Sequence, residues 1–240
     1  MFPSVLALFI TMVDEIGCSK LLNRLLYSRC SPSRVYTVLS SLNYDMREVI
    51  KEMGFGILLG MKKYKLRLDL IYWLVERFDP IDGSIQVVNE KLNLNSQIFA
   101  KTIGVFDGGE DIGDIIMEEK CKRVSSSRLV ISKLQQTLEK NEEAELFVRN
   151  FLLFVAGTFL IPSTSLYVLR SFEELVKELN DVTSAKSKNW ASMSWRYLVE
   201  GIRRFKQGRS NYVCGCIFFL QVIKSIMFLL KLVYLYFVLD

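Results

Sequence analysis

The sequence predicts a mainly α-helical single domain that carries one small β-hairpin. Apolar residues recur at helical spacing in several segments, and short turn signals built from Pro, Gly and Asn separate these segments. Residues 85–88 and 92–94 instead suggest two short strands joined by a polar link at 89–91. A chain of 240 residues with 50% apolar content is long enough to bury a core.

Three helices are expected before the hairpin. Lys62, Lys63 and Lys65 form a short basic run that precedes the third of these helices. The signals are Ser31-Pro32 and Asn43 as helix starts, Gly54-Phe55-Gly56 as a helix end, apolar spacing over 66–78 for the third helix, and Asp79-Pro80 as its stop.

Helices are also expected to fill most of the chain after the hairpin. Asp107–Asp111 is predicted to be a flexible acidic loop, and 107–128 is the best internal linker. The uncharged run 151–161 is too short to span a membrane and is predicted to form a central core helix. The expected elements are a short helix that Ser96 caps and Gly104 closes, helices over 129–138 and 142–160, one from the Ser171-x-x-Glu174 capping box to Leu179, and one over 190–205.

Composition excludes several kinds of catalysis. The chain has no histidine, so it cannot supply a Ser-His-Asp triad, a Cys-His pair or a zinc site that uses His. The five cysteines lack a C-x-x-C motif, and we expect reduced structural thiols at Cys18, Cys30, Cys121, Cys214 and Cys216. Gly54 to Gly60 has one residue too many for a dinucleotide loop and follows a helix. We therefore predict that the protein is not an enzyme and needs no cofactor, metal or small-molecule substrate.

Positive charge is concentrated in one predicted helix and its flanks. The net charge is +5, and the stretch from Lys186 to Arg209 has seven basic residues against the single acid Glu200. The candidate phosphate contacts for nucleic acid are Arg196, Arg203, Arg204, Lys206 and Arg209. The alternative is a solvated helix face whose other side packs on the core.

The two ends of the chain are rich in apolar residues. Between 213 and 239, 22 of 27 residues are apolar, but Lys224 and Lys231 interrupt the run. The stretch is therefore either a membrane anchor or a buried helix near 212–223 followed by an unusual tail. Residues 1–13 lack the basic start of a secretory signal and are expected to form a packed helix or a disordered end.

Several ordered segments carry a family resemblance. They are EMGFGIL at 52–58, DLIYWLVERFDP at 69–80, IGVFDGG at 103–109, FVAGTFLIP at 154–162, KNWA at 188–191 with the segment 195–205, and YVCGCIFFLQ at 212–221. Together they resemble the transposon-derived plant mobile domain, often labelled aminotransferase-like. They also resemble the related domain that precedes plant Ulp-type SUMO-protease-like cysteine proteases. Two departures are Val105-Phe106-Asp107, where the family has Leu-Pro, and the end of the resemblance after Ile223.

The resemblance divides the chain and implies a function. It predicts a divergent segment at 1–29, a helical domain at 30–223 and an atypical apolar tail at 224–240. The implied function is a non-enzymatic, transposon-derived interaction module, nuclear or cytoplasmic, whose partners are nucleic acid or chromatin proteins. One alternative is a truncated accessory domain of a SUMO-protease-like polyprotein. Another is a membrane protein anchored through 213–239.

Overall fold

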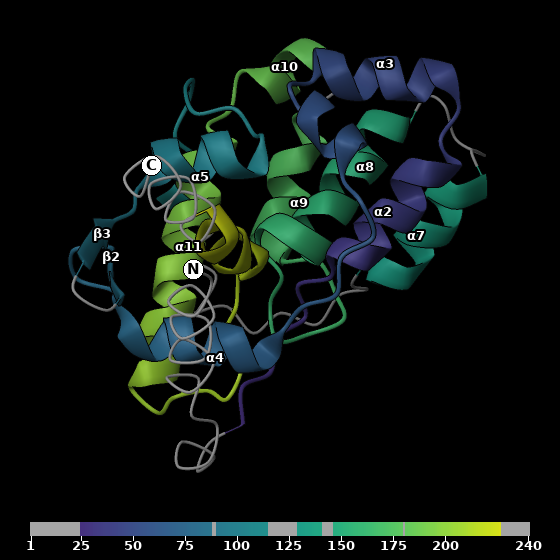
Figure 1. Ribbon diagram of the computed structural model, residues 1–240. Helices are drawn as coiled ribbons and strands as arrows, with labels where there is room; N and C mark the ends of the chain where they lie inside the picture. The colour runs from purple at the N-terminus through teal and green to yellow at the C-terminus, as the bar shows by residue number, and fades with distance from the viewer. Residues whose placement is uncertain (1–24, 88–89, 115–128, 141–145, 180, 227–240) are drawn as a thin grey trace, which may run out of the picture.

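The computed structural model describes residues 25–87, 90–114, 129–140, 146–179 and 181–226, and the fold is mainly α (Figure 1). The predicted fold class is therefore confirmed. A last helix, which has no label in Figure 1, begins at residue 218. The labelled helices are α2 (Pro32–Ser41), α3 (Tyr44–Glu52), α4 (Leu68–Arg77), α5 (Ser96–Ile103), α7 (Ile131–Lys140), α8 (Phe147–Val155), α9 (Arg170–Lys177), α10 (Val182–Lys186) and α11 (Trp190–Lys206), with the 3-10 turn η1 (Gly56–Gly60) and the π-helical turn η4 (Ala156–Leu160).

The small sheet is antiparallel and contains the predicted hairpin, but residues 90 and 91, which were predicted to lie in the link, belong to its second strand. Strand β2 (Ser84–Val87) pairs with β3 (Glu90–Asn93), and Ile85 lies opposite Leu92. A third short strand, β1 (Phe78–Asp79), pairs with the other edge of β2. The sequence analysis missed β1 because the Asp79-Pro80 signal was interpreted only as the end of the preceding helix.

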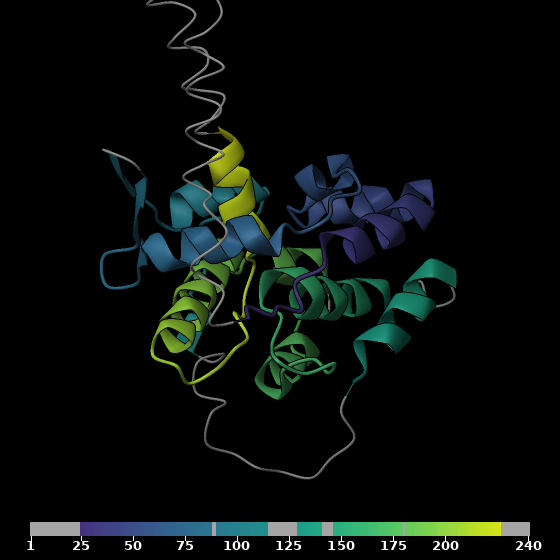
Figure 2. The ribbon, with the colours of Figure 1, turned by 60° about the horizontal axis from the view of Figure 1, so that its bottom comes forward.

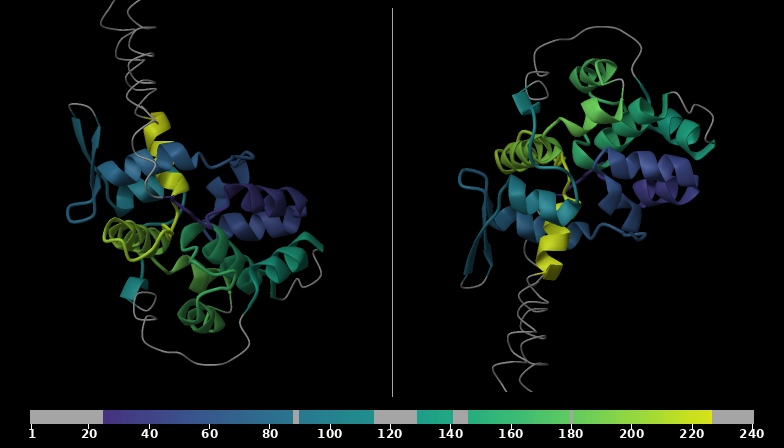
Figure 3. Two further views of the ribbon diagram at one scale, coloured as in Figure 1. Left: turned by 90° about the horizontal axis from the view of Figure 1, so that it is seen from below. Right: turned by 90° about the horizontal axis from the view of Figure 1, so that it is seen from above.

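One continuous core joins two groups of elements. Figure 3 shows α2 and α3 on one side of the molecule, and α4, α5 and the sheet on the other. Between them, α8 and η4 bury every side chain from Asn150 to Leu160. The predicted central core helix is thus confirmed for its described part, although its last turn is π-helical.

Several predicted helix ends are confirmed, and two are wrong. The Asn43 side chain accepts a hydrogen bond from the Met46 N–H at 2.9 Å, and Gly104 ends α5 with a left-handed φ of 79°. However, Asn95, and not Ser96, caps α5. The predicted capping box at Ser171 is also wrong, because α9 begins at Arg170 and Ser171 lies inside its first turn. A capping box forms instead around Asp181, which the sequence analysis missed.

The extended segment before α2 is held between η4 and residues 211–213. The Ser31 N–H donates to the Thr158 carbonyl oxygen at 2.9 Å, and the Tyr27 N–H donates to the Asn211 oxygen at 2.9 Å. The Val213 N–H in turn donates to the Tyr27 oxygen. Residues far apart in the chain therefore lie side by side here.

The first half of the long apolar stretch belongs to the core. Val213, Cys216–Leu220 and Ile223 are buried, and the yellow helix that begins at residue 218 lies beside α4 (Figure 2). Lys224 places its ammonium group 5.0 Å from the ring centroid of Trp73, which favours a cation by cation–π attraction. Among the described residues, no helix has the length and apolar content that a membrane span requires. Residues 227–239 of the predicted anchor, like residues 1–13, lie outside the described part.

Candidate nucleic-acid interface

The predicted phosphate-binding residue Arg196 is engaged with the acidic loop. Its guanidinium pairs with Asp111, with Nη1 at 2.9 Å from Oδ2, and also with Asp114. The side chain is 35% exposed. Its charge is therefore balanced by two carboxylates from a loop more than 80 residues earlier in the chain.

The cations at the end of α11 stabilise the junction with α4 and β1. Lys206 Nζ donates to the carbonyl oxygens of Glu76 at 2.9 Å and Phe78 at 2.8 Å, where a positive charge complements the helix dipole of α4. Arg203 donates to the Pro80 oxygen at 2.9 Å and pairs with Glu200. Arg204 pairs with the other oxygen of the same carboxylate at 3.0 Å.

The predicted acidic loop lies between α5 and the residues before α11, and several contacts join it to residues 187–189. The Glu110 N–H donates to the Ser187 oxygen, and the Asn189 N–H donates to the Glu110 oxygen, both at 2.8 Å. The Glu110 carboxylate pairs with Lys188, and a Cβ on Gly109 would lie 2.0 Å from the Ser187 oxygen. The acidic and basic segments therefore hold each other. The rest of the predicted linker, 115–128, lies outside the described residues.

Of the five predicted contacts, Arg209 differs from the others. It is exposed beyond the end of α11, where its backbone N–H donates to the Arg204 carbonyl oxygen at 3.0 Å, but its guanidinium group has no carboxylate or carbonyl partner within the described residues. The other four, Arg196, Arg203, Arg204 and Lys206, all have partners within the domain. The structure therefore does not gather the five residues into one surface of unengaged charge.

A second basic region lines an open groove of about 570 Å³ between the segment before α2 and the loop before α4. One wall carries serine hydroxyls, and the other carries lysines and a tyrosine. The lining residues are Ser28, Cys30, Ser31, Pro32, Ser33, Lys63, Tyr64, Lys65, Leu66 and Leu68.

The lysines around this groove are not neutralised. Lys62, Lys63 and Lys65 are exposed, and within the described residues none of them forms an ion pair with a carboxylate. Tyr64 is 42% exposed between them, and its ring lies 5.2 Å from that of Phe218. The basic run is evident in the sequence, but the position of Lys63 and Lys65 in one groove with three serine residues of a distant segment is not.

Arg29 belongs to the segment that forms the serine wall, but it is not among the residues that line the groove. Its Nε donates to the Thr164 oxygen at 2.9 Å, and its guanidinium carbon lies 5.8 Å from the ring centroid of Tyr212. The adjoining helix α2 has no acidic residue in its first turn. An anion in the groove would therefore meet lysine ammonium groups, serine hydroxyls and no carboxylate from the first turn of α2.

The described cysteines are free thiols, in agreement with the predicted structural role. Cys30 and Cys216 are buried, and Cys214 is partly buried. Burial raises the pKa of the Cys214 thiol, although the positive charge of Arg204 acts in the opposite direction. No cluster of three or more Cys, Asp or Glu residues suitable for a metal occurs in the described ranges. Cys18 and Cys121 lie outside those ranges.

The features above define a mainly α domain with a basic groove at its surface. Residues 28–221 match the family model of a domain of unknown function, DUF8566, and the chain belongs to this family. The predicted helical domain, residues 30–223, begins and ends two residues later than the matched range. No curated protein and no solved structure matches the chain.

Proposed function

We propose that this domain is a non-enzymatic interaction module that binds the phosphate backbone of nucleic acid through its basic groove. The observation that carries the proposal is the pair Lys63 and Lys65, which line the groove together with three serine residues, with the exposed Lys62 next to them in the sequence. None of these lysines has a carboxylate partner in the described chain. Lysine ammonium groups and hydroxyls are common donors to phosphate oxygens, and such contacts carry no sequence information.

The groove also offers an aromatic surface. Tyr64 stands half-exposed between the lysines, and Tyr27 is 43% exposed at the other end of the segment that forms the serine wall. Stacking of bases on aromatic rings beside a basic track is typical of single-strand binding. We therefore expect single-stranded nucleic acid to bind at least as tightly as a duplex of the same length.

A transposon-derived origin and a nuclear location complete the proposal. They rest on the resemblance of segments such as 69–80 and 154–162 to the plant mobile domain. In this structure those segments form α4 and the end of α8 with η4, and they bury most of their apolar side chains. They act as packing motifs, so any contact with nucleic acid is expected from the surface loops.

The test measures binding of labelled 20-nucleotide single strands and duplexes by fluorescence anisotropy between 50 and 200 mM salt. The variant Lys62→Ala/Lys63→Ala/Lys65→Ala is compared with Lys51→Ala/Lys101→Ala/Lys177→Ala, which removes the same charge from exposed positions on α3, α5 and α9. We expect the loop variant to bind at least 10-fold more weakly. Its salt slope should fall by about 0.7–0.9 for each lost phosphate contact.

Three results would contradict this assignment. Equal losses in the two triple variants would mean that only net charge matters. A loss on Arg203→Gln/Arg209→Gln with none in the loop variant would place the interface on α11, as the sequence predicted. Absence of binding at 50 mM salt would exclude nucleic acid as the partner and leave a protein partner as the alternative.

A further inference from the structure

Two buried cysteines from distant parts of the chain are brought together beneath the groove. Cys30 ends the segment before α2, and Cys216 lies just before the helix that begins at residue 218. The backbone hydrogen bonds between Tyr27 and residues 211–213 align the two segments, and Ser28 Oγ adds a bond to the Val213 oxygen at 3.0 Å. Neither cysteine has a role in the proposed phosphate binding.

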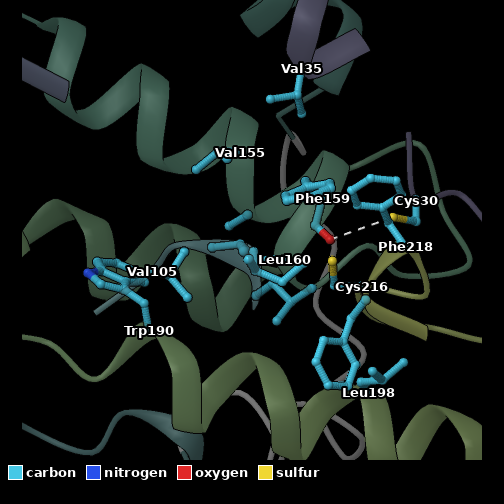
Figure 4. Close-up of a cluster of buried hydrophobic side chains, with 14 of the residues drawn as sticks. Cys30, Val35, Val105, Val155, Phe159, Leu160, Trp190, Leu198, Cys216 and Phe218 are labelled. Atoms are coloured by element: carbon cyan, nitrogen blue, oxygen red, sulfur yellow. Dashed lines mark hydrogen bonds between the residues drawn. The ribbon is translucent and has the colours of Figure 1, made fainter. Parts of the chain in front are cut away.

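The two thiols lie near the same carbonyl group in an apolar environment. Cys30 Sγ lies 3.8 Å from the Phe159 carbonyl oxygen, and Figure 4 shows both cysteine side chains directed toward that carbonyl group. Burial, followed by the hydrogen bond with Cys30, raises the pKa of the Cys216 thiol well above its usual range. Cys216 is fully buried, and Cys30, which is 4% exposed, is one of the residues that line the groove.

We propose that Cys30 and Cys216 form an oxidative modification site, at which a peroxide converts the two thiols into an intramolecular disulfide. The shared position of the two sulfurs beside the Phe159 carbonyl, on two segments joined by backbone hydrogen bonds, supplies the proximity that the bond requires. The groove supplies the route by which a small oxidant reaches Cys30. The ligand class of this site is therefore a small peroxide, and the product is a covalent link between the segment before α2 and residue 216.

The chemistry balances in two steps. The Cys30 sulfur attacks one oxygen of hydrogen peroxide, the O–O bond breaks, and a sulfenic acid and one water molecule form. The Cys216 sulfur then attacks the sulfenic sulfur, its proton leaves with the hydroxyl group as a second water molecule, and the S–S bond forms. Both thiols are oxidised, and the peroxide is reduced to water.

Cys214 provides a comparison within the same segment. It is only two residues from Cys216 but is less buried. Its charged neighbour is Arg204 of α11, whereas the neighbour of Cys216 is Cys30. Gly201 of α11 approaches the Cys214 carbonyl closely, so this residue is held against α11. If the position of the side chains determines which disulfide bond forms, Cys30 forms a bond with Cys216 and not with Cys214.

The test uses the full-length chain with Cys18→Ser, Cys121→Ser and Cys214→Ser, so that only Cys30 and Cys216 remain. Folded protein is treated with hydrogen peroxide, and intact mass, free thiols and peptides are then measured. We expect a mass decrease of two hydrogen atoms, loss of both free thiols and a peptide pair linking 30 to 216. Because the bond closes a very long loop, Tm should rise by about 10 °C and return after reduction.

A matched protein distinguishes the proposed pair from general oxidation. It keeps Cys30 and Cys214, and carries Cys18→Ser, Cys121→Ser and Cys216→Ala. We expect no intramolecular disulfide in this protein. A Cys30–Cys214 bond at a comparable rate would overturn the inference. So would two thiols that stay reduced in the Cys30/Cys216 protein while the partly exposed Met61 oxidises.

Discussion

At the scale of single residues, two glycines allow α11 to pack closely against residues 214–216. A Cβ on Gly201 would lie 2.3 Å from the Cys214 carbonyl oxygen, and Gly215 has a φ of 91° with Leu198 of α11 directly opposite. Any side chain at Gly201 would have to displace backbone atoms, which cannot move as easily as the end of a flexible side chain. This contact determines where residues 214–216 lie, and hence where Cys216 lies.

Replacement of Gly201 by alanine should therefore destabilise the domain. We expect a loss of about 1–3 kcal/mol in the free energy of unfolding, because the added methyl group overfills the contact with the Cys214 carbonyl. Urea denaturation followed by circular dichroism measures the change. Gly60→Ala is the control, because a Cβ there meets no atom within 4 Å and its φ is not positive. Equal midpoints for the two variants would contradict the close approach.

The role of a residue was predicted correctly more often when its hydrogen-bond partner lies nearby in the sequence. Asn43 and Gly104 act within three or four residues of their hydrogen-bond partners, and both were identified correctly. Arg196 and Lys188 pair with acids about 80 residues away, so their basic stretch resembled a free surface in the sequence. The groove was missed for the same reason, since its two walls come from two separate segments, residues 28–33 and 63–68.

At the scale of elements, the small sheet shows how one charged residue fixes a turn. Asp82 lies in the connection between β1 and β2, and its carboxylate accepts hydrogen bonds from Lys91 of β3 at 2.5 Å and from Ser84 Oγ at 2.6 Å. These bonds to the ionised form, with that from Lys91 the largest, lower the pKa of Asp82 from 3.8 to about 2. The same pair raises the pKa of Lys91.

This shift predicts a defined dependence of stability on pH. Because the folded-state pKa lies below that of the unfolded chain, the Asp82 carboxylate stabilises the fold above about pH 4. That contribution is lost as the pH falls from about 4 to 2. The difference in urea midpoint between the native sequence and Asp82→Asn should be constant from pH 5 to 7 and should shrink toward zero near pH 2.

The partner residue supplies the control for this experiment. In a Lys91→Met background the strongest cause of the lowered pKa is absent, so the effect of Asp82→Asn should depend much less on pH. An equally strong pH dependence in both backgrounds would show that Lys91 does not cause it.

The sequence predicted most helices of the fold but not the π-helical turn η4. Most helices were placed correctly because apolar periodicity is a property of a continuous segment. The π-helical turn η4 was not predicted, since its register depends on packing. Its Thr158 and Phe159 carbonyl oxygens accept hydrogen bonds from Ser31 and Cys30, residues that are distant in sequence. Local signals carry no information about such pairings.

At the scale of the whole molecule, residues 213–223 complete the core. Phe219 is fully buried, with its ring centroid 5.0 Å from that of Phe99 and 5.9 Å from that of Trp195. A segment that packs in this way cannot enter a bilayer without opening the domain. In the sequence, the apolar run fitted a core helix and a membrane anchor equally well, because burial in protein and burial in lipid select the same side chains.

Phe219→Ala should therefore cost about 3–5 kcal/mol of stability, because it leaves a cavity in the core. Thermal or urea unfolding of the protein in detergent-free buffer measures the loss. Ile226→Ala is the control, since Ile226 is 40% exposed and should change stability by less than about 0.5 kcal/mol. Similar stabilities for the two variants would mean that the segment does not pack in the core, and would favour the membrane-anchor hypothesis.

The chain cannot complete the hydrogen bonds of Tyr27 until Asn211 and Val213 have been synthesised. Because the partners of Tyr27 are synthesised about 185 residues later, the segment before α2 waits roughly 10–40 s on the ribosome at 5–20 residues per second. During that interval Cys30 and the floor of the groove lack the residues that bury them. A nascent chain that stalls before residue 211 therefore leaves apolar surface exposed at the start of α2.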